Sequence, residues 1–225
     1  MSDMEDLSDN QKKQIEFVQF HPGYDYSDFV EGLHPRVNED GSIGFQLRDG
    51  VFKQFVSAAR KSVGAGETQK SYVFIIDEIN RGEISKILGE LFFSINPGYR
   101  SPSGVISTQY SNMHSDNTEK FYIPENVYII GTMNDIARSV DSFDFAMRCR
   151  FRFVELTADS QKSMLNGLVD KSIRGETVTR MDSLNVETGK TEDLNENYHI
   201  GPAYFLKLND FGFDDLWKDY LAPLL

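Results

Sequence analysis

Residues 72–81 read YVFIIDEINR, and this stretch decides the fold class. Five uncharged residues run directly into Asp77 and Glu78. An apolar run of this length is typical of a strand buried on both faces, as in a parallel sheet with helices above and below it. Two further runs follow, NVYIIGTMN (126–134) and FRFVEL (151–156). Helix-like segments separate the three runs, so the sequence predicts an α/β fold with a parallel sheet.

The segments around these runs divide the chain into three parts. We expect a polar lead-in at residues 1–14, the α/β core at 15–157, and a small helical lid subdomain at 158–225. Periodicity and turn residues predict the elements inside these parts. They are a strand at 15–20, a hairpin at 37–50 that turns at Asp40-Gly41, helices at 51–63, 84–95 and 159–173, a polar loop at 174–197, and further helices after 201.

Composition excludes several classes of protein. The 225 residues carry 35 acidic and 23 basic side chains, for a net charge of −12, which disfavours a bulk electrostatic grip on nucleic acid. The single cysteine, Cys149, permits no intrachain disulfide and fits a reducing cytosol, so we expect a cytoplasmic protein. No apolar run approaches the roughly 20 residues of a membrane span. The acidic start, MSDMEDLSDNQ, is unlike a secretory signal.

Polar side chains lie at the ends of the first two of these predicted strands and just before the third. Asp77-Glu78 and Asn134 end the first two strands, and the Arg148/Arg150 cluster lies just before the third. In open parallel sheets, ligands bind at the carboxyl ends of the strands. The convergence of these groups is the main physical argument for a site.

An apolar strand followed by Asp-Glu is the Walker B pattern. Asp77 would hold Mg²⁺ through water, and Glu78 would act as a base or orient the attacking water in phosphoryl transfer. The alternative is that both acids only cap the next helix, whose N-terminal dipole favours negative charge. Taken alone, the pattern favours that alternative; together with Asn134 it favours function.

The remaining candidates also have two interpretations. Asn134 could orient water beside a γ-phosphate, or it could be an ordinary turn residue. Arg148 or Arg150 could be an arginine finger that reaches a neighbouring subunit, although Arg148 also suits a helix end. Arg81 and Arg138 are further candidates, for which an exposed surface arginine is the ordinary explanation. The four histidines show no metal-ligand spacing.

Four blocks in this order resemble the AAA+ module of the McrB type. They are FVQFHPGYDYSDFVEGLHP (17–35), VFIIDEINRGEISKILGEL (73–91), PENVYIIGTMNDIARSVDSFDFAMRCRFRF (124–153) and IGPAYF (200–205). The resemblance implies a nucleotide-driven motor subunit of a modification-dependent restriction system that uses GTP or ATP with Mg²⁺. It further implies a hexameric ring, an McrC-like nuclease partner, and DNA contact through other domains or the ring. Asp77 and Glu78 take the Walker B roles, Asn134 the first sensor role, and Arg148 or Arg150 the arginine that acts in trans.

The sequence departs from the family pattern in three places. The family's MNTADRS reads MNDIARS, with Asp135, Ile136 and Ala137 at the changed positions, which questions the base preference and the water geometry. ALRRRF reads AMRCRF, with Cys149 as its middle residue. The phosphate-binding loop G-x-x-x-x-G-K-[ST] does not occur, and SVGAGETQK (62–70) is no substitute for it.

The missing loop has a structural consequence. In the resembled fold its strand is central, between the strand at 151–156 and the strand at 126–134. We therefore expect a fragment of a longer chain or a repaired sheet edge, with poor hydrolysis by this chain alone. The alternatives are a degenerate AAA+ scaffold that does not turn over nucleotide, and a MoxR-like or dynein-related remodeller.

Overall fold

The computed structural model describes residues 7–62, 70–116, 118–134, 145–191 and 196–224. The chain divides into two compact units, Met1–Arg152 and Phe153–Leu225, and each is described by itself. Within the described residues, no helix is both long and apolar enough to span a membrane.

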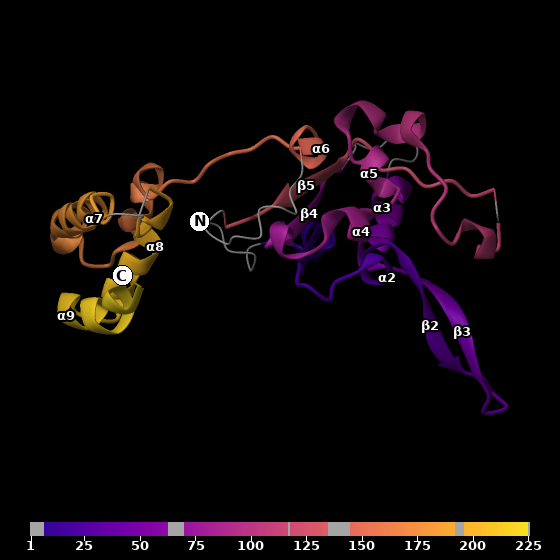
Figure 1. The fold of residues 1–225 in the computed structure, drawn as a ribbon, viewed down its shortest axis with the longest axis horizontal. Coiled ribbons are helices and arrows are strands. Elements are labelled where there is room, and N and C mark those ends of the chain that lie inside the picture. The colour runs from indigo at the N-terminus through magenta and orange to yellow at the C-terminus, as the bar shows by residue number, and fades with distance from the viewer. Residues whose placement is uncertain (1–6, 63–69, 117, 135–144, 192–195, 225) are drawn as a thin grey trace. The chain divides into compact units, whose positions relative to one another are not determined.

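A three-stranded parallel sheet forms the first unit's centre (Figure 1). Its strands are β1 (Ile15–Gln19), β4 (Tyr72–Asp77) and β5 (Val127–Gly131), in the spatial order β1-β4-β5. Both pairings are parallel. The predicted class, an α/β fold with a parallel sheet and flanking helices, is confirmed.

One face of this sheet packs on an aromatic core. Phe74 and Ile76 of β4 are almost fully buried beneath α3 (Val51–Lys61). Phe52 of α3 meets the Phe74 ring edge-on at 4.9 Å between centroids, and it stacks on Phe29 at 4.7 Å. Such offset and edge-to-face contacts are the favoured geometries of aromatic pairs. The remaining helices of this unit are α1 (Asp9–Lys12), α2 (Tyr26–Phe29), α4 (Ile84–Leu88), α5 (Leu91–Ser94) and α6 (Phe145–Arg148).

The hairpin predicted at 37–50 is present, and its first strand begins earlier, at Glu31. β2 (Glu31–Val37) pairs antiparallel with β3 (Ile43–Asp49), and the ribbon extends from the sheet towards the lower right of Figure 1. Gly41 adopts a φ of +80° at the turn, where an L-residue with a side chain would be strained. The register puts the apolar pairs Leu33–Leu47, Pro35–Phe45 and Val37–Ile43 on one face.

The second unit is helical, and its elements differ from those predicted after residue 157. The predicted helix at 159–173 is a 3₁₀ helix over Asp159–Gly167 followed by a short 3₁₀ turn over Lys171–Ile173. The remaining α-helices are α7 (Arg174–Thr188), α8 (Pro202–Phe205) and α9 (Phe213–Leu216), and further short helical turns are at 196–198, 206–209, 217–221 and 222–224. Their core is Leu165, Leu168, Met181, Ile200, Phe205, Leu208, Leu216 and Leu221.

Three predicted elements are wrong. The single helix at 84–95 is interrupted at Gly89, whose φ is +50°, so α4 and α5 are separate. Most of the loop predicted at 174–197 is the helix α7. The helix was not predicted because its buried face is largely polar and gives no apolar stripe. Residues 151–156 form no strand, and Val154 and Leu156 are about 70% exposed. A strand needs a neighbour for its backbone groups, and the described residues offer this segment none.

Candidate functional site

Asp77 ends β4 and forms the centre of a polar corner at the carboxyl ends of the sheet. Its Oδ1 accepts a hydrogen bond from Thr132 Oγ1 at 2.5 Å. Its Oδ2 accepts one from Gln19 Nε2 at 3.1 Å. Gln19 is the register partner of Asp77 on β1, and Thr132 follows β5 directly. All three parallel strands therefore contribute one polar side chain to the same edge.

Glu78 makes the turn that follows. Its φ of 52° and ψ of 45° lie in the left-handed region, which is uncommon for a residue with a side chain. This conformation lets its backbone N–H donate to Thr132 Oγ1 at 3.2 Å, while Ile79 N–H donates to the Thr132 carbonyl at 2.9 Å. Backbone strain of this kind concentrates at functional sites, where surrounding contacts hold it.

The Glu78 side chain points towards Arg81. Glu78 Oε2 lies 3.2 Å from Arg81 Nε, an ion pair whose arginine is more than half exposed. Oε2 is buried and accepts no hydrogen bond in the part of the chain that the structure describes. The Glu78 side chain as a whole is 24% exposed, so a water molecule can reach part of it.

Asn134 belongs to the same corner through its backbone. Asn80, which is 2% exposed, donates from Nδ2 to the Asn134 carbonyl at 3.3 Å. This contact joins the turn after β4 to the segment after β5. The structure therefore places Asp77 and Glu78 at one corner and connects the Asn134 backbone to it through Asn80, and the catalytic roles of these residues stay predictions.

The two arginines have different surroundings. Arg150 Nε donates to the Phe92 carbonyl at 3.0 Å, and its guanidinium lies 4.0 Å from the centroid of the Phe92 ring. Arg148 is exposed at the end of α6. Arg81 is paired with Glu78. The altered positions Asp135, Ile136 and Ala137, the candidate Arg138, and most of the glycine-rich segment at 62–70 lie outside the described residues.

Sequence reasoning missed three residues of this corner. Thr132, Gln19 and Asn80 were not predicted to take part. Their roles depend on the register between strands that are 50 residues or more apart, as the contacts of Asp77 with Gln19 and Thr132 show. The available signal was position alone, because Gln19 and Asp77 are the last residues of their strands and Thr132 follows β5 directly.

The oxygen atoms of Asp77 and Thr132 are donors that suit a hard cation such as Mg²⁺. Carboxylate and hydroxyl oxygens are the ligands that Mg²⁺ prefers, and Mg²⁺ commonly keeps several waters and takes only one or two carboxylates. Within the described ranges, no three His, Cys, Asp or Glu side chains gather in a way that could cage a metal. Asp77 therefore fits a magnesium held through water and through the phosphates of a ligand.

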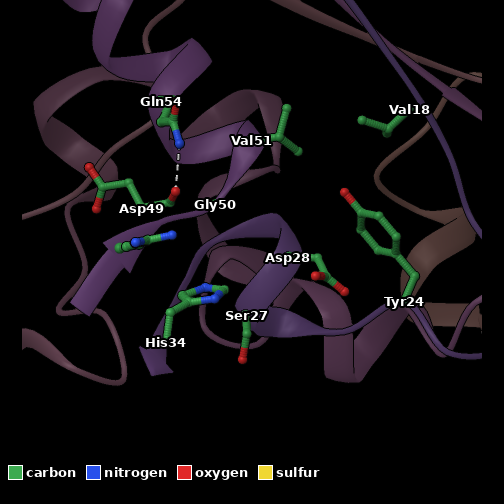
Figure 2. Close-up of a pocket in the computed structure, with 10 residues that line it drawn as sticks. Val18, Tyr24, Ser27, Asp28, His34, Asp49, Gly50, Val51 and Gln54 are labelled. Carbon is green, nitrogen blue, oxygen red and sulfur yellow. Dashed lines mark hydrogen bonds between the residues drawn. The ribbon is translucent and has the colours of Figure 1, made fainter. Parts of the chain in front are cut away.

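A separate open pocket of about 470 Å³ lies at the base of the hairpin (Figure 2). The residues that line it include Tyr24, Asp28, His34, Arg48 and Asp49. Burial, with Asp28 nearby, raises the pKa of Tyr24 to about 12. The pocket includes none of the predicted site residues, which all lie at the sheet edge, at the end of α6 or at the start of the following segment.

Comparisons with known proteins identify the family. The family model "AAA domain (dynein-related subfamily)" matches residues 4–151. The chain is 35% identical over 199 residues to the "Type IV methyl-directed restriction enzyme EcoKMcrB subunit" of Escherichia coli (strain K12), covering 86% of this chain and 40% of that protein. It is 22% identical over 176 residues to the "Type II restriction enzyme BsuMI component YdiS" of Bacillus subtilis (strain 168), covering 66% and 50%.

The chain spans half or less of the length of these two relatives. The matched region nevertheless includes the whole polar corner, from Gln19 to Asn134. On the fold, the corner and these matches, the chain belongs to the AAA domain family of the dynein-related subfamily, as a module of the McrB type.

Proposed function

We propose that this chain is the catalytic part of a nucleoside triphosphatase that serves a restriction system. The observation that carries the proposal is the corner in which one threonine hydroxyl joins Asp77 to the backbone of Glu78. Phosphoryl transfer depends mainly on positioning and on electrostatic stabilisation. A corner that fixes two acids beside Asn134 supplies the positioning.

Each residue has a definite role in this proposal. Asp77 would hold magnesium through water, and the bound ion would neutralise charge on the phosphates. Glu78, whose side chain is partly exposed, orients or deprotonates the attacking water. Asn134 directs the water towards the γ-phosphate. Arg148 stabilises the transition state in trans; we favour it over Arg150, because Arg150 is already held by Phe92.

The wider function follows from the two relatives, both of which are named as restriction-enzyme components. We propose GTP or ATP as the nucleotide, a ring of subunits (a hexamer by resemblance), and an McrC-like nuclease as partner. The ring would drive DNA translocation in the cytoplasm, with DNA held by other domains or by the assembled ring, because this chain's net charge of −12 suits no bulk DNA grip. The phosphate-binding loop is assigned to a segment outside the 225 residues.

The direct test uses an extended chain, in which a strand–loop–helix segment bearing G-x-x-x-x-G-K-[ST] precedes residue 1. We expect it to release phosphate from GTP or ATP. Asp77→Asn should lower turnover by about 100-fold or more and raise the Mg²⁺ concentration needed for half-maximal rate, because a charged ligand is lost. The matched control is Asp210→Asn, which alters an exposed carboxylate of the second unit. An Asp77→Asn rate equal to that of the control contradicts the proposal.

A degenerate scaffold is the second candidate, and one observation favours it. Cys149 replaces the middle arginine of the family block, and the next arginine, Arg150, is held within its own subunit by Phe92. If Arg148 does not reach the neighbouring subunit, neither of these two arginines can act as the arginine finger of the ring. If the extended chain forms a ring but does not turn over nucleotide, the scaffold function is supported. If it turns over nucleotide and the Arg148→Ala substitution lowers the rate, the enzyme function is supported.

A further inference from the structure

His114 lies in a buried cluster of charges at the base of the hairpin. Its side chain is 6% exposed, and its Nε2 lies 2.7 Å from Oε2 of the fully buried Glu31 of β2. Lys53 Nζ of α3 lies 2.5 Å from the same oxygen and 3.4 Å from His114 Nε2. The other ring nitrogen, Nδ1, is buried and has no hydrogen-bond partner in the part of the chain that the structure describes. Glu119 Oε2 lies 3.7 Å from Nδ1, so each nitrogen of the imidazole faces a carboxylate.

The contacts of Nε2 indicate that this nitrogen carries a proton. A neutral imidazole has one N–H donor and one acceptor nitrogen. If Nε2 were the acceptor, its lone pair would face the Glu31 carboxylate at 2.7 Å with no proton between them. Glu31 does not supply that proton near neutral pH, because its contacts with Lys53 outweigh its burial and hold its pKa below the usual 4.5. Nε2 therefore donates to Glu31.

The surroundings of Nδ1 favour a second proton on the same ring. Once Nε2 carries a proton, a neutral ring leaves the Nδ1 lone pair buried and turned towards the Glu119 carboxylate. A buried acceptor without a donor is costly, whereas a proton on Nδ1 converts this contact into an ion pair. The charges agree, because Glu31, Asp49 and Glu119 carry three negative charges and the Lys53 ammonium neutralises one of them. The imidazolium is thus the one form of His114 that suits both of its nitrogens.

The charged groups around His114 come from several elements. They are Glu31 of β2, Asp49 of β3, Lys53 of α3 and Glu119 of the segment that carries His114. The same segment also contacts the pair formed by Tyr26 and Glu90, because Glu90 accepts from the Gln109 backbone N–H at 2.8 Å. Burial raises the pKa of Tyr26, so its hydroxyl keeps its proton near neutral pH. Among these groups, histidine is the side chain type whose charge ordinarily changes between about pH 5 and 8.

We infer that His114 carries two protons in the folded protein and attaches residues 106–121 to the hairpin base in a proton-dependent way. The same segment donates the Tyr110 backbone N–H to Glu31 Oε1 at 3.1 Å. It is closed by the bridge between Ile106 and Phe121 and leads into β5. Loss of one proton from His114 sets the Nδ1 lone pair against Glu119 and removes a positive charge from an acidic cluster. The inference goes beyond the proposed function and needs no nucleotide.

The sign of the pH dependence follows from this assignment. A closed state that holds one more proton than the open state is most stable at mildly acidic pH, and this stability is lost as the pH rises. One linked proton changes the opening equilibrium by at most tenfold per pH unit. We therefore expect local opening of the segment to increase by about tenfold between about pH 6 and about pH 8.

Amide hydrogen exchange of Tyr110 in the 225-residue chain measures this opening, once each rate is divided by the intrinsic rate at that pH. His114→Gln keeps an amide that can donate to Glu31 but does not titrate, so we expect its opening to stay constant over the same range. His34→Gln, on the hairpin strand β2, is the matched control and should keep the wild-type pH dependence. A wild-type opening that does not change with pH, or the same change in His114→Gln as in wild type, overturns the inference.

The ¹⁵N chemical shifts of the His114 ring give a second readout without any substitution. We expect both nitrogens to carry protons at about pH 7, at which an exposed imidazole is mostly neutral. A neutral His114 ring at that pH overturns the inference, also if His114→Gln does not fold. Neither measurement involves nucleotide, so failure of this inference and failure of the proposed function are seen in different experiments.

Discussion

Thr132 joins the two acids of the corner through one hydroxyl group. Its Oγ1 donates to Asp77 Oδ1 at 2.5 Å and accepts from Glu78 N–H at 3.2 Å. The first bond fixes the direction of the Asp77 carboxylate, and the second supports the left-handed turn at Glu78. Thr132 touches no ligand in this account and is a positioning residue.

Substitution of Thr132 should therefore affect rate more than fold. In the extended chain, Thr132→Val keeps the shape and removes both hydrogen bonds, so we expect turnover to fall by about 10- to 100-fold, the usual effect of losing a partner of a metal ligand. The Mg²⁺ concentration for half-maximal rate should rise. Thr132→Ser should restore both values, since it keeps the hydroxyl. A Thr132→Val enzyme with an unchanged Mg²⁺ requirement contradicts the positioning role.

Part of the corner was predictable at this scale. Asp77, Glu78 and Asn134 stand at the ends of apolar runs, so the rule for parallel sheets brings them to one edge. Thr132, Gln19 and Asn80 could not be predicted, because their contacts depend on strand register and on the turn at Glu78. No local pattern encodes a contact such as Gln19 to Asp77, which spans 58 positions.

Among the elements, the hairpin base is fixed by a buried charged cluster. Glu31 of β2 is fully buried and accepts hydrogen bonds from Lys53 Nζ of α3 at 2.5 Å and from the Tyr110 backbone N–H at 3.1 Å. It also pairs with His114 Nε2 at 2.7 Å. Lys53 further contacts Asp49 of β3 at 2.7 Å. The cluster thus joins both hairpin strands, α3 and the loop before β5.

Removing the Lys53 charge should destabilise the first unit. Lys53→Met keeps the aliphatic stem but leaves Glu31 buried without its main counter-charge, which costs about 3–5 kcal/mol in comparable pairs. The free energy of unfolding from urea titration measures this. Lys86→Met is the matched control, because its ion pair with Glu83 is exposed and should contribute less than about 1 kcal/mol. Equal effects for the two variants contradict a structural role for the cluster.

The same cluster predicts a pH dependence. Burial acts to raise the pKa of Glu31, but the hydrogen bonds from Lys53 and His114 and the charge of Lys53 outweigh it and hold that pKa below its usual 4.5. A carboxylate whose pKa is lower in the folded state than in the unfolded state stabilises the fold at pH values above its unfolded pKa. That stability is lost as the pH falls through the folded pKa. The difference in unfolding free energy between wild type and Glu31→Gln should therefore shrink below pH 4.5. A difference that stays constant from neutral to strongly acidic pH contradicts this.

Elements with a clear hydrophobic periodicity or a turn sequence were predictable. Elements that depend on contacts with distant parts of the chain were not. β4, the hairpin and α3 follow from an apolar run, an Asp-Gly turn and helical spacing. α7 was missed because Thr177, Asn185 and Thr188 form much of its buried face. Thr177 Oγ1 donates to the Ile173 carbonyl at 2.9 Å, and Asn185 bonds both backbone groups of Ile200. Local hydrogen bonds thus satisfy polar groups that a hydrophobic pattern cannot reveal.

At the scale of the whole molecule, the sheet edge accounts for the largest difference from the sequence prediction. The run at 151–156 has strand character, yet Val154 and Leu156 are exposed and form no ladder. A strand is stabilised by its neighbours rather than by its own sequence. In the part of the chain that the structure describes, β5 pairs with β4 alone, and Phe17, Tyr128 and Ile130 on one face of the sheet are more than half exposed.

The central claim is that Glu78 drives hydrolysis at the β4–β5 corner. The most direct measurement is single-turnover hydrolysis and nucleotide retention by the extended chain with Glu78→Gln, beside Glu83→Gln, which alters an exposed acid five positions away. We expect Glu78→Gln to bind nucleotide and Mg²⁺ but to cleave the nucleotide about 100-fold or more slowly, while Glu83→Gln cleaves it at the wild-type rate. Cleavage by Glu78→Gln at the rate of the Glu83→Gln control would contradict a catalytic role for Glu78.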